Sequence, residues 1–308
     1  MANIGVVKGE KAPSRQRLWR TLTPYAYLSP TIVLLAVLSL IPIATVFYYS
    51  LMDNVIITRN EPTFIGLSNY AEILSEDTFH QALEHTLFLA TLSVIAHFIL
   101  GLSFALLLNT NLVSGGVKAI FRVVYILPWV FTASIIAILW RLLLNPNGVV
   151  NYLLIEFNLV SQPIEWLSSR QLALYTVTFI NIWAGYPFYM VSFLAGLQGI
   201  PDDLYEAGKI DGANGPQLFR FITLPQLKPI ISSLAVLDFI WTTHQFTLIW
   251  MTTGGGPIRA TEVLSTYTYK LAFSSYEFSL ASTTAMLILL LSSVLAVFYV
   301  RNQRLAND

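Results

Sequence analysis

The sequence predicts an all-α membrane protein with six transmembrane helices, and two observations support this fold class: the composition and a series of long apolar runs. Of the 308 residues, 55% are hydrophobic and only 11% are charged. A soluble domain carries about 25% charged residues. The alternative, a large soluble protein with an unusually apolar core, would have too few charges to solvate its surface. A membrane-embedded chain is therefore favoured.

Six apolar runs are long enough to cross a bilayer, which takes about 20 residues in a helix. We expect spans at Tyr27–Met52, Leu83–Asn109, Val117–Leu144, Leu172–Gly199, Pro229–Met251 and Ser279–Val300. The first run is too long for a signal peptide and has no suitable cleavage site, so a signal anchor is the better interpretation. Pro42, Pro128 and Pro187 interrupt spans and are expected to kink them, the alternative being ordinary helix curvature.

Lysine and arginine predict the orientation, because they concentrate on the cytoplasmic side of membrane proteins. One set of connections and both terminal tails together carry 12 basic residues, and the opposite side carries 5. We therefore expect a multi-pass protein of the cell (inner) membrane with both termini cytoplasmic. The predicted organisation is an N-terminal tail over residues 1–26, a six-span domain over 27–301 and a C-terminal tail over 302–308.

Several classes of function are disfavoured by what the sequence contains. A net charge of zero suggests no nucleic-acid partner. The chain has no cysteine, which excludes disulfides and thiolate chemistry. The glycine run at Gly254–Pro257 lacks the spacing of a phosphate-binding loop, so this chain is not expected to hydrolyse ATP. No nucleophile with a nearby base is evident, which disfavours a membrane enzyme.

A polar segment, "YEAGKIDGANGPQLFRFITLP", separates the fourth and fifth spans. Asp203 and Glu206 have the spacing of a capping box and predict a short helix over Leu204–Asp211. Gly212 is suited to end that helix in a left-handed conformation. Asn214 followed by proline predicts a second helix start. The product is a helix–turn–helix on the cytoplasmic surface.

This segment has two possible roles. An amphipathic linker could rest on the membrane interface. A docking element for another protein is favoured instead, because the small residues Ala207 and Gly208 would let another backbone approach closely.

Polar residues within the spans indicate where a solute could bind. In the fifth span such residues share one helical face, which comprises Asp238, Trp241, Thr242 and Gln245. The fourth span has a small, partly polar face, expected to line a cavity, made of Asn181, Ala184, Gly185, Phe188 and Ser192. Its bulky face, expected to pack, is made of Trp183, Tyr186, Met190 and Leu194.

The polar groups have a second interpretation, in which they only join neighbouring spans. Asp238 in particular could pair with a basic side chain of a partner subunit. His244 lies off the shared face, and His97 is alone in the second span. Each is expected to be a hydrogen-bonded structural residue.

The polar segment resembles the cytoplasmic-loop signature of permease subunits of binding-protein-dependent ABC importers. That signature reads E-A-A, three residues, G, nine residues, I-x-L-P. This chain has Glu206-Ala207-Gly208, Gly212 and Ile222-Thr223-Leu224-Pro225 with both spacings intact. Gly208 stands where alanine is usual. The stretches "FIGLSNY", "FRVVYILPWV" and "TTGGGPIRAT" are similar to motifs of the carbohydrate-uptake branch, and the glycine-proline loop is typical of its larger permease subunit.

The resemblance implies the type I ABC importer transmembrane-domain fold, with a coupling loop over 201–225. It implies a second, different permease subunit, two ATPase subunits that hold ATP and Mg, an extracytoplasmic solute-binding protein and a carbohydrate substrate. No cofactor is expected on this chain itself. The implied ATPase-coupling residues are Glu206, Ala207, Gly208, Asp211, Gly212, Leu224 and Pro225. The resemblance also supports solute-binding roles for Asn181, Gly185, Phe188, Asp238, Trp241, Thr242 and Gln245.

One alternative is a stand-alone ion-coupled secondary transporter that uses Asp238. Ion coupling usually needs several ionisable groups within the membrane, and only Asp238, His97 and His244 qualify here.

Overall fold

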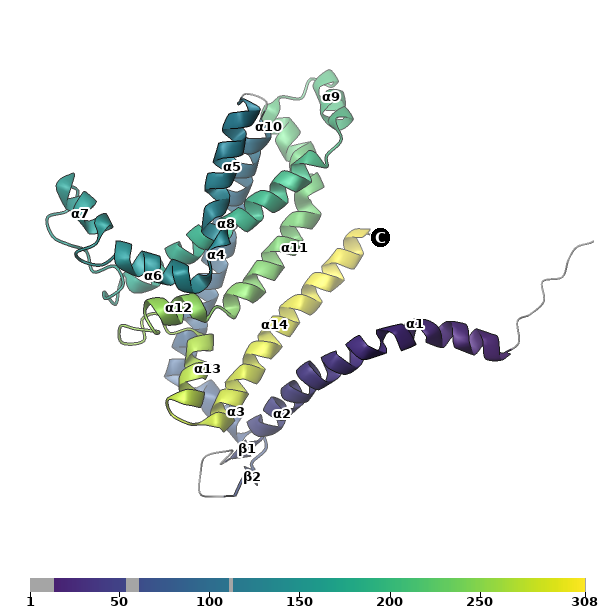
Figure 1. The fold of residues 1–308 in the computed structure, drawn as a ribbon, viewed down its shortest axis with the longest axis vertical. Coiled ribbons are helices and arrows are strands. Elements are labelled where there is room, and N and C mark those ends of the chain that lie inside the picture. Colours follow the sequence, from purple (N-terminus) through teal and green to yellow (C-terminus); the bar gives the residue numbers. More distant parts are fainter. Residues whose placement is uncertain (1–13, 54–60, 111–112, 308) are drawn as a thin grey trace, which may run out of the picture.

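The computed structural model describes residues 14–53, 61–110 and 113–307, and most of them are helical (Figure 1). In chain order the helices are α1 (Ser14–Leu35), α2 (Ile41–Ser50), α3 (Ser68–Ser75), α4 (Asp77–Asn109), α5 (Gly115–Val130), α6 (Ala133–Leu143), α7 (Val149–Glu156), α8 (Ala173–Gln198), α9 (Asp202–Ile210), α10 (Gly215–Leu218), α11 (Leu224–Thr243), α12 (Thr247–Thr252), α13 (Leu264–Phe273) and α14 (Phe278–Asn307). Two π-helical turns, η1 (Ala36–Leu40) and η2 (Phe219–Thr223), join α1 to α2 and α10 to α11. The strands β1 (Met52–Asp53) and β2 (Thr63–Phe64) pair antiparallel.

Four helical stretches of the described residues are long and apolar enough to cross a membrane. They are Leu22–Ser50, Asp77–Asn109, Ala173–Gln198 and Phe278–Arg301, and they overlap the first, second, fourth and sixth predicted spans. The first contains the π-helical turn directly before Pro42, where the N–H of Ile41 bonds to the carbonyl of Ala36. Proline lacks an N–H and its ring crowds the preceding turn, which accounts for the irregularity. Pro187 lies inside α8 without ending it.

The third predicted span, Val117–Leu144, is not one continuous helix: the kink expected at Pro128 is replaced by a sharper break beyond that proline, which divides the span in two. α5 and α6 meet at a bend of 99°, with Phe131 and Thr132 extended between them. The hydroxyl of Thr132 accepts a hydrogen bond from the N–H of Ile135 at 3.5 Å and so caps the new helix. The pair forms a fifth crossing only if both halves are counted together.

The fifth predicted span, Pro229–Met251, is also wrong as one helix. α11 ends at Thr243, and α12 begins at Thr247 after a short turn. α11 contains a buried carboxylate and several hydroxyl side chains, and it is not among the helices apolar enough to span a membrane alone. Within the described residues the structure therefore has four or five candidate spans, where six were expected.

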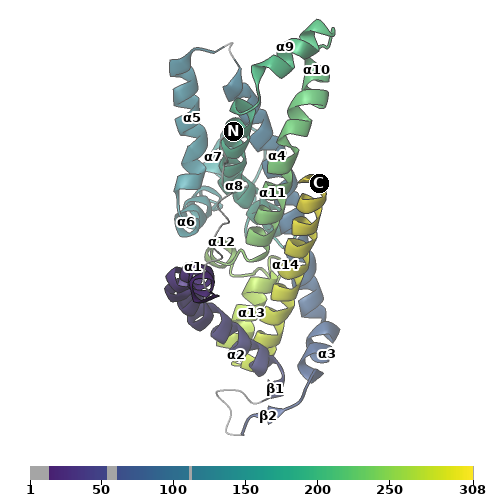
Figure 2. The ribbon, with the colours of Figure 1, turned by 90° about the vertical axis from the view of Figure 1, so that its right-hand side faces the viewer.

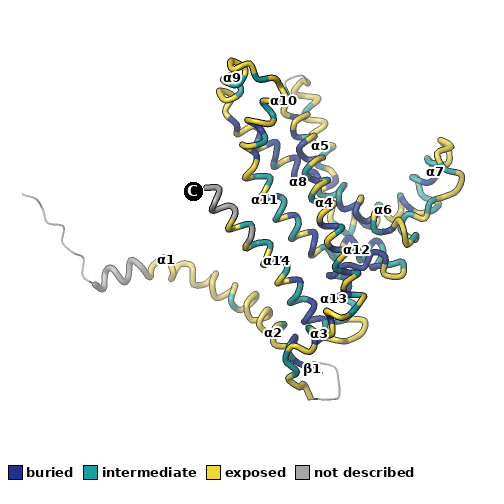
Figure 3. Tube along the Cα trace, turned by 180° about the vertical axis from the view of Figure 1, so that it is seen from behind, coloured by how far each residue is buried: buried dark blue, intermediate teal, exposed yellow. Residues whose placement is uncertain are grey.

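The core is built on a close crossing of α4 and α8, with α11 packed against both. Gly101 permits this crossing, since a Cβ there would lie 2.4 Å from the Cβ of Tyr189. Side chains including Tyr189, Phe193, Leu197 and Leu227 form the buried cluster around it. By contrast, α1 leans away from the other helices and is exposed along the part whose burial is described (Figure 3).

The two ends of the long axis carry different structures. α9 and α10 project at one end, and the β1–β2 pair lies at the opposite end (Figures 1 and 2). α11 runs from the α9–α10 end into the middle of the molecule, so it connects the projecting segment to the interior.

Candidate functional site

A cavity of about 270 Å³ lies among α4, α8, α11 and the α5–α6 bend. Six of the seven predicted solute-binding residues line it, namely Asn181, Gly185, Asp238, Trp241, Thr242 and Gln245. The other lining residues are His97, Pro128, Trp129, Phe131, Ala133, Ile136, Ala184 and Leu248. The helical faces predicted for α8 and α11 thus meet around one space.

Hydrogen bonds link the polar groups across the helices. Asn181 donates from Nδ2 to the hydroxyl of Ser93 on α4 at 2.9 Å, and Gln245 donates from Nε2 to Oδ1 of Asn181 at 3.2 Å. Within α11, Thr242 donates to Oδ1 of Asp238 at 3.2 Å. These groups therefore do join neighbouring helices, and they also remain at the cavity wall.

The hydrogen-bonding partner of Asp238 lies in the same chain. Nδ1 of His97 on α4 is 2.8 Å from Oδ2 of Asp238, and Nε2 is 3.2 Å from the backbone carbonyl oxygen of Asn181. His97 is hydrogen-bonded, as expected, but it belongs to the cavity, where the sequence analysis did not place it. The sequence could not predict this pair, because 141 residues separate the two and helical spacing relates only residues of one helix.

Gly185 has a defined role at this pair. A Cβ on Gly185 would lie 2.4 Å from Cε1 and 2.5 Å from Nε2 of His97. No atom of the imidazole could keep its position against that contact. The absence of a side chain at Gly185 is therefore what admits the ring of His97 beside α8.

Aromatic rings form another part of the wall. Phe188 does not line the cavity itself, but its ring lies 5.5 Å from that of Trp241 and 5.9 Å from that of Trp129. Trp241 is 55% exposed, so one large ring remains accessible. Trp129 was not predicted as a site residue, because the sequence predicted only a kink at Pro128 and not the sharp bend that places Trp129 at the cavity.

The bulky face of α8 packs as predicted. Tyr186, Met190 and Leu194 are buried, and the ring of Trp183 lies 5.4 Å from that of Trp140 on α6. Ser192 turns its hydroxyl to the carbonyl of Phe188 and does not line the cavity. The predicted structural role of His244 agrees with its contact at 3.1 Å to the hydroxyl of Ser292.

The projecting segment is a helix–turn–helix, as predicted. Gly212 has φ +83, the left-handed conformation that favours glycine. The N–H of Gly212 bonds to the carbonyl of Lys209 at 3.0 Å, and that of Ala213 bonds to the carbonyl of Gly208 at 2.9 Å. This pair of bonds is a Schellman motif, which ends α9. Asn214 then caps α10.

The capping of α10 is reciprocal. Oδ1 of Asn214 accepts the N–H of Gln217 at 3.0 Å, and Oε1 of Gln217 accepts the N–H of Asn214 at 2.7 Å. The capping box predicted for Asp203 and Glu206 does not form. α9 begins two residues earlier than that box requires, at Asp202 after Pro201. Asp202 and Asp203 therefore both lie in its first turn, where the helix dipole favours negative charge.

Gly208 is used within the segment and not at its surface. A Cβ on Gly208 would lie 2.7 Å from Cδ2 of Leu218 and 3.0 Å from Cδ1 of Ile222. The expectation that its small size serves another backbone is therefore wrong for this residue. A hydrogen bond of 2.9 Å between the hydroxyls of Tyr205 and Thr223 holds α9 to the start of α11 in addition.

The remaining predicted coupling residues lie at or near the surface of this end. Glu206, Ala207, Asp211, Gly212 and Pro225 are exposed, and Leu224 is half-buried. Ile210, which was not predicted, is 86% exposed at the end of α9.

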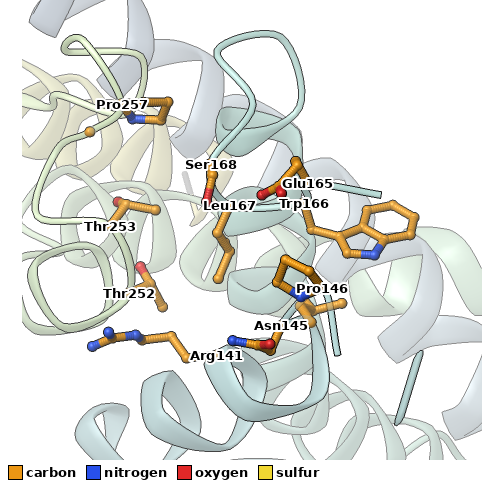
Figure 4. Close-up of a pocket in the computed structure, with 12 residues that line it drawn as sticks. Arg141, Asn145, Pro146, Glu165, Trp166, Leu167, Ser168, Thr252, Thr253 and Pro257 are labelled. Atoms are coloured by element: carbon orange, nitrogen blue, oxygen red, sulfur yellow. The ribbon is translucent and has the colours of Figure 1, made fainter. Parts of the chain in front are cut away.

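A second cavity of about 360 Å³ lies nearer the other end (Figure 4). Its wall includes Arg141, Asn145 and Glu165 on one side and Thr253 and Pro257 of the glycine-rich loop on the other. Arg141 donates from Nη1 to the carbonyl of Met251 at 3.2 Å. This arginine therefore links α6 to α12.

A helical membrane chain with a polar cavity among its long helices and a helical hairpin projecting from one end has the architecture of a transporter membrane subunit. The chain belongs to the family of binding-protein-dependent transport system inner membrane components, which matches residues 97–307. These proteins are permease subunits of ABC transporters, and the fold expectation based on the family is supported.

Relatives and solved structures agree with this assignment. A probable ABC transporter permease protein of Sinorhizobium fredii is 35% identical over 95% of this chain and 93% of the relative. The trehalose/maltose transport system permease protein MalF of Thermococcus litoralis is 34% identical over 92% of this chain and 94% of its own. A bacterial ABC transporter involved in the import of the acidic polysaccharide alginate is similar with a TM-score of 0.81 at 25% identity, over 95% of this chain and all of the other.

Proposed function

We propose that this chain is one of two permease subunits of an ATP-driven importer of a di- or oligosaccharide or a related polyol or glycoside. The observation that carries the proposal is the cavity, where Asn181, Thr242 and Gln245 present hydrogen-bonding groups beside the exposed ring of Trp241. Amide and hydroxyl groups match sugar hydroxyls, and an aromatic face matches the apolar side of a pyranose ring. Relatives named for trehalose, maltose and alginate transport favour the same class.

The proposed assembly contains a second, different permease subunit, two ATPase subunits that hold ATP and Mg, and an extracytoplasmic binding protein. A similar alginate transporter is known in complex with a pentasaccharide-bound periplasmic protein, which supports such a partner. The α9–α10 end faces the cytoplasm in this proposal, as do both termini, because the basic residues concentrate there. This chain itself hydrolyses no ATP.

The mechanism is alternating access driven through α9. The Schellman motif, the contact of Gly208 with the second limb and the Tyr205–Thr223 hydrogen bond fix α9 to the start of α11. α11 carries Asp238 about 21 Å further along, at 1.5 Å per residue. Closure of the ATPase subunits against the exposed face of α9 would therefore move one wall of the cavity directly.

The ion-coupled alternative has less support. Its candidate group, Asp238, is paired with His97 at 2.8 Å and is not a free carboxylate. Family membership also favours an ATPase partner.

The test is co-purification from the native membrane with mass spectrometry, followed by ATPase assays of the isolated complex. We expect a second permease subunit and an ATPase to co-purify. Gly212→Ala should abolish solute-stimulated hydrolysis while the complex stays assembled, because alanine is strained at φ +83. Gly116→Ala is the matched control, since a Cβ at Gly116 meets nothing within 4 Å.

A second matched pair addresses the exposed face of α9. Glu206→Gln should reduce stimulated hydrolysis, whereas Glu156→Gln, on exposed α7, should not. If the chain purifies alone and transports solute with no ATPase present, the proposal fails and Asp238 becomes the candidate ion-coupling group.

A further inference from the structure

The cavity holds one carboxylate and one imidazole, and no lysine or arginine lines it among the residues that the structure describes. Asp238 is 8% exposed and His97 is 2% exposed. A carboxylate buried to this degree would give the cavity a negative charge unless a partner compensates it. The protonation of His97 therefore decides the net charge that a solute meets.

Both ring nitrogens of His97 face oxygen atoms. Nε2 lies 3.2 Å from the carbonyl oxygen of Asn181, which can only accept, so Nε2 carries a hydrogen. A neutral imidazole with that hydrogen has a bare lone pair on Nδ1. Nδ1 lies 2.8 Å from Oδ2 of Asp238, so a further proton must lie between these two atoms.

The pair has a net charge of zero wherever that proton lies. If Nδ1 holds it, an imidazolium faces a carboxylate, and if the carboxyl group holds it, both partners are neutral. The remaining combination, an ionised Asp238 with the only imidazole hydrogen on Nδ1, would direct the Nε2 lone pair at the carbonyl oxygen of Asn181. At this burial such a contact and the uncompensated charge would both be costly.

The groups packed around the pair are uncharged. Thr242 of α11 donates to the second carboxylate oxygen, Gly185 of α8 lies against the imidazole, and the ring of Tyr189 lies 5.6 Å from it. No other charged side chain from α4, α8 or α11 lines the cavity among the described residues. The compensation of Asp238 by His97 is thus local and complete.

We propose that the Asp238–His97 pair makes the cavity selective for uncharged sugars and against acidic ones, an inference that rests on the carbohydrate uptake proposed above. Among the described residues that line the cavity, an anionic solute finds no free cation, since the imidazole of His97 is already paired with Asp238. A cationic solute likewise finds no free carboxylate. Each would lose its hydration without compensation, whereas a neutral sugar exchanges water for the amide and hydroxyl groups of the wall.

This selectivity sets the chain apart from one structural neighbour. That protein belongs to a transporter that imports the acidic polysaccharide alginate. A substrate of that charge should not pass through a cavity that has the Asp238–His97 pair as its sole ionisable lining among the described residues.

The test uses the complete complex of both permease and ATPase subunits in nanodiscs, without the binding protein, so that selection by the membrane subunits alone is measured. Equilibrium dialysis at pH 7 first ranks maltose, trehalose, cellobiose and sucrose. The disaccharide that binds most tightly is then compared with its own uronic acid and its own 6-amino derivative. We expect both charged forms to bind at least about tenfold more weakly than the neutral form.

Variants of the pair then shift the preference in predictable directions. His97→Gln leaves Asp238 uncompensated, so the 6-amino form should gain at least about tenfold relative to the neutral form. His97→Gln combined with Asp238→Asn should restore a preference for the neutral form. His80→Gln and Glu84→Gln are matched controls, because both side chains are exposed on α4 and lie outside the cavity.

The outcomes are distinguishable. If the uronic acid binds the wild-type complex as tightly as the neutral sugar, the charge inference is overturned while carbohydrate uptake stands. If none of the carbohydrates binds in any form, the proposed function fails and the inference fails with it. The wild-type comparison decides the question even if a variant does not assemble.

Discussion

Gly185→Ala should disrupt the cavity although it adds only one methyl group. The new Cβ would lie 2.4 Å from Cε1 of His97, whereas an ordinary van der Waals contact begins at 3.4 Å. The imidazole would have to retreat by about 1 Å, a shift that weakens its contacts with Asp238 and Asn181. The two contacts hold the ring from opposite sides, so any movement of the ring lengthens at least one of these hydrogen bonds.

The cost has two sources. Overpacking a well-packed core typically costs about 1–3 kcal/mol. Loss of a hydrogen bond to a buried imidazole adds about 1–3 kcal/mol, because the freed polar group stays out of water. The lower sum is about 2 kcal/mol. If restoring the binding geometry costs this free energy, solute binding is weakened more than tenfold.

The assay is equilibrium binding of the tightest neutral disaccharide to the assembled complex, together with its thermal unfolding. Gly185→Ala should raise Kd at least about tenfold and lower the melting temperature, whereas Gly116→Ala, with open space around it, should change neither. In a His97→Ala background the imidazole that would clash with the new methyl group is gone. Adding Gly185→Ala there should change Kd and the melting temperature little. Wild-type binding and melting by Gly185→Ala would refute the reasoning.

The remaining predictions concern the two ends of the molecule. Gly208→Ala should leave ATPase coupling within about twofold of wild type. The gain in helix propensity, up to about 1 kcal/mol, offsets the cost of the close contact with the flexible ends of Leu218 and Ile222. Complete uncoupling would contradict this prediction. Burial, with a hydrogen bond to Glu76, raises the pKa of Tyr267 above its ordinary value of 10.0, so the stability it contributes is present below pH 10 and is lost as pH rises further. Tyr267→Phe should therefore flatten the alkaline limb of thermal unfolding scans, and an unchanged limb would argue against the contact. Lys270→Met should lower the free energy of unfolding by about 3 kcal/mol, because it leaves the carboxylate of Glu262 buried without the amine now 2.5 Å away, and Lys270→Arg should recover most of the stability measured by denaturant unfolding.

Some site features followed from local patterns alone. The shared face of Asp238, Trp241 and Thr242 depends only on helical periodicity, and these three residues of α11 do line one cavity, together with Gln245 from the turn that follows. The left-handed turn at Gly212 was predictable in the same way, because few other residues adopt that conformation cheaply. Patterns of this kind require no knowledge of what lies opposite.

The breaks in the helices were not predictable from apolarity. The bend of 99° after α5 interrupts an apolar run, and the turn after α11 interrupts the predicted span Pro229–Met251. Hydropathy measures transfer into lipid, and it does not register whether neighbouring helices leave room for a straight continuation. The same limitation hid Trp129, which reaches the cavity because of the bend.

The sequence by itself determined the class of protein, the placement of most long helices, the projecting helix–turn–helix and the faces that line the cavity, because each depends on composition or on spacing within one segment. The tertiary structure decided which groups meet. It brought His97 to Asp238, which lies 141 residues away in the sequence. It also packed Gly208 of α9 against Leu218 and Ile222 of the helical segment that follows. Contacts between helices depend on their mutual packing, which no single segment encodes, and the net charge of the cavity depends on such a contact.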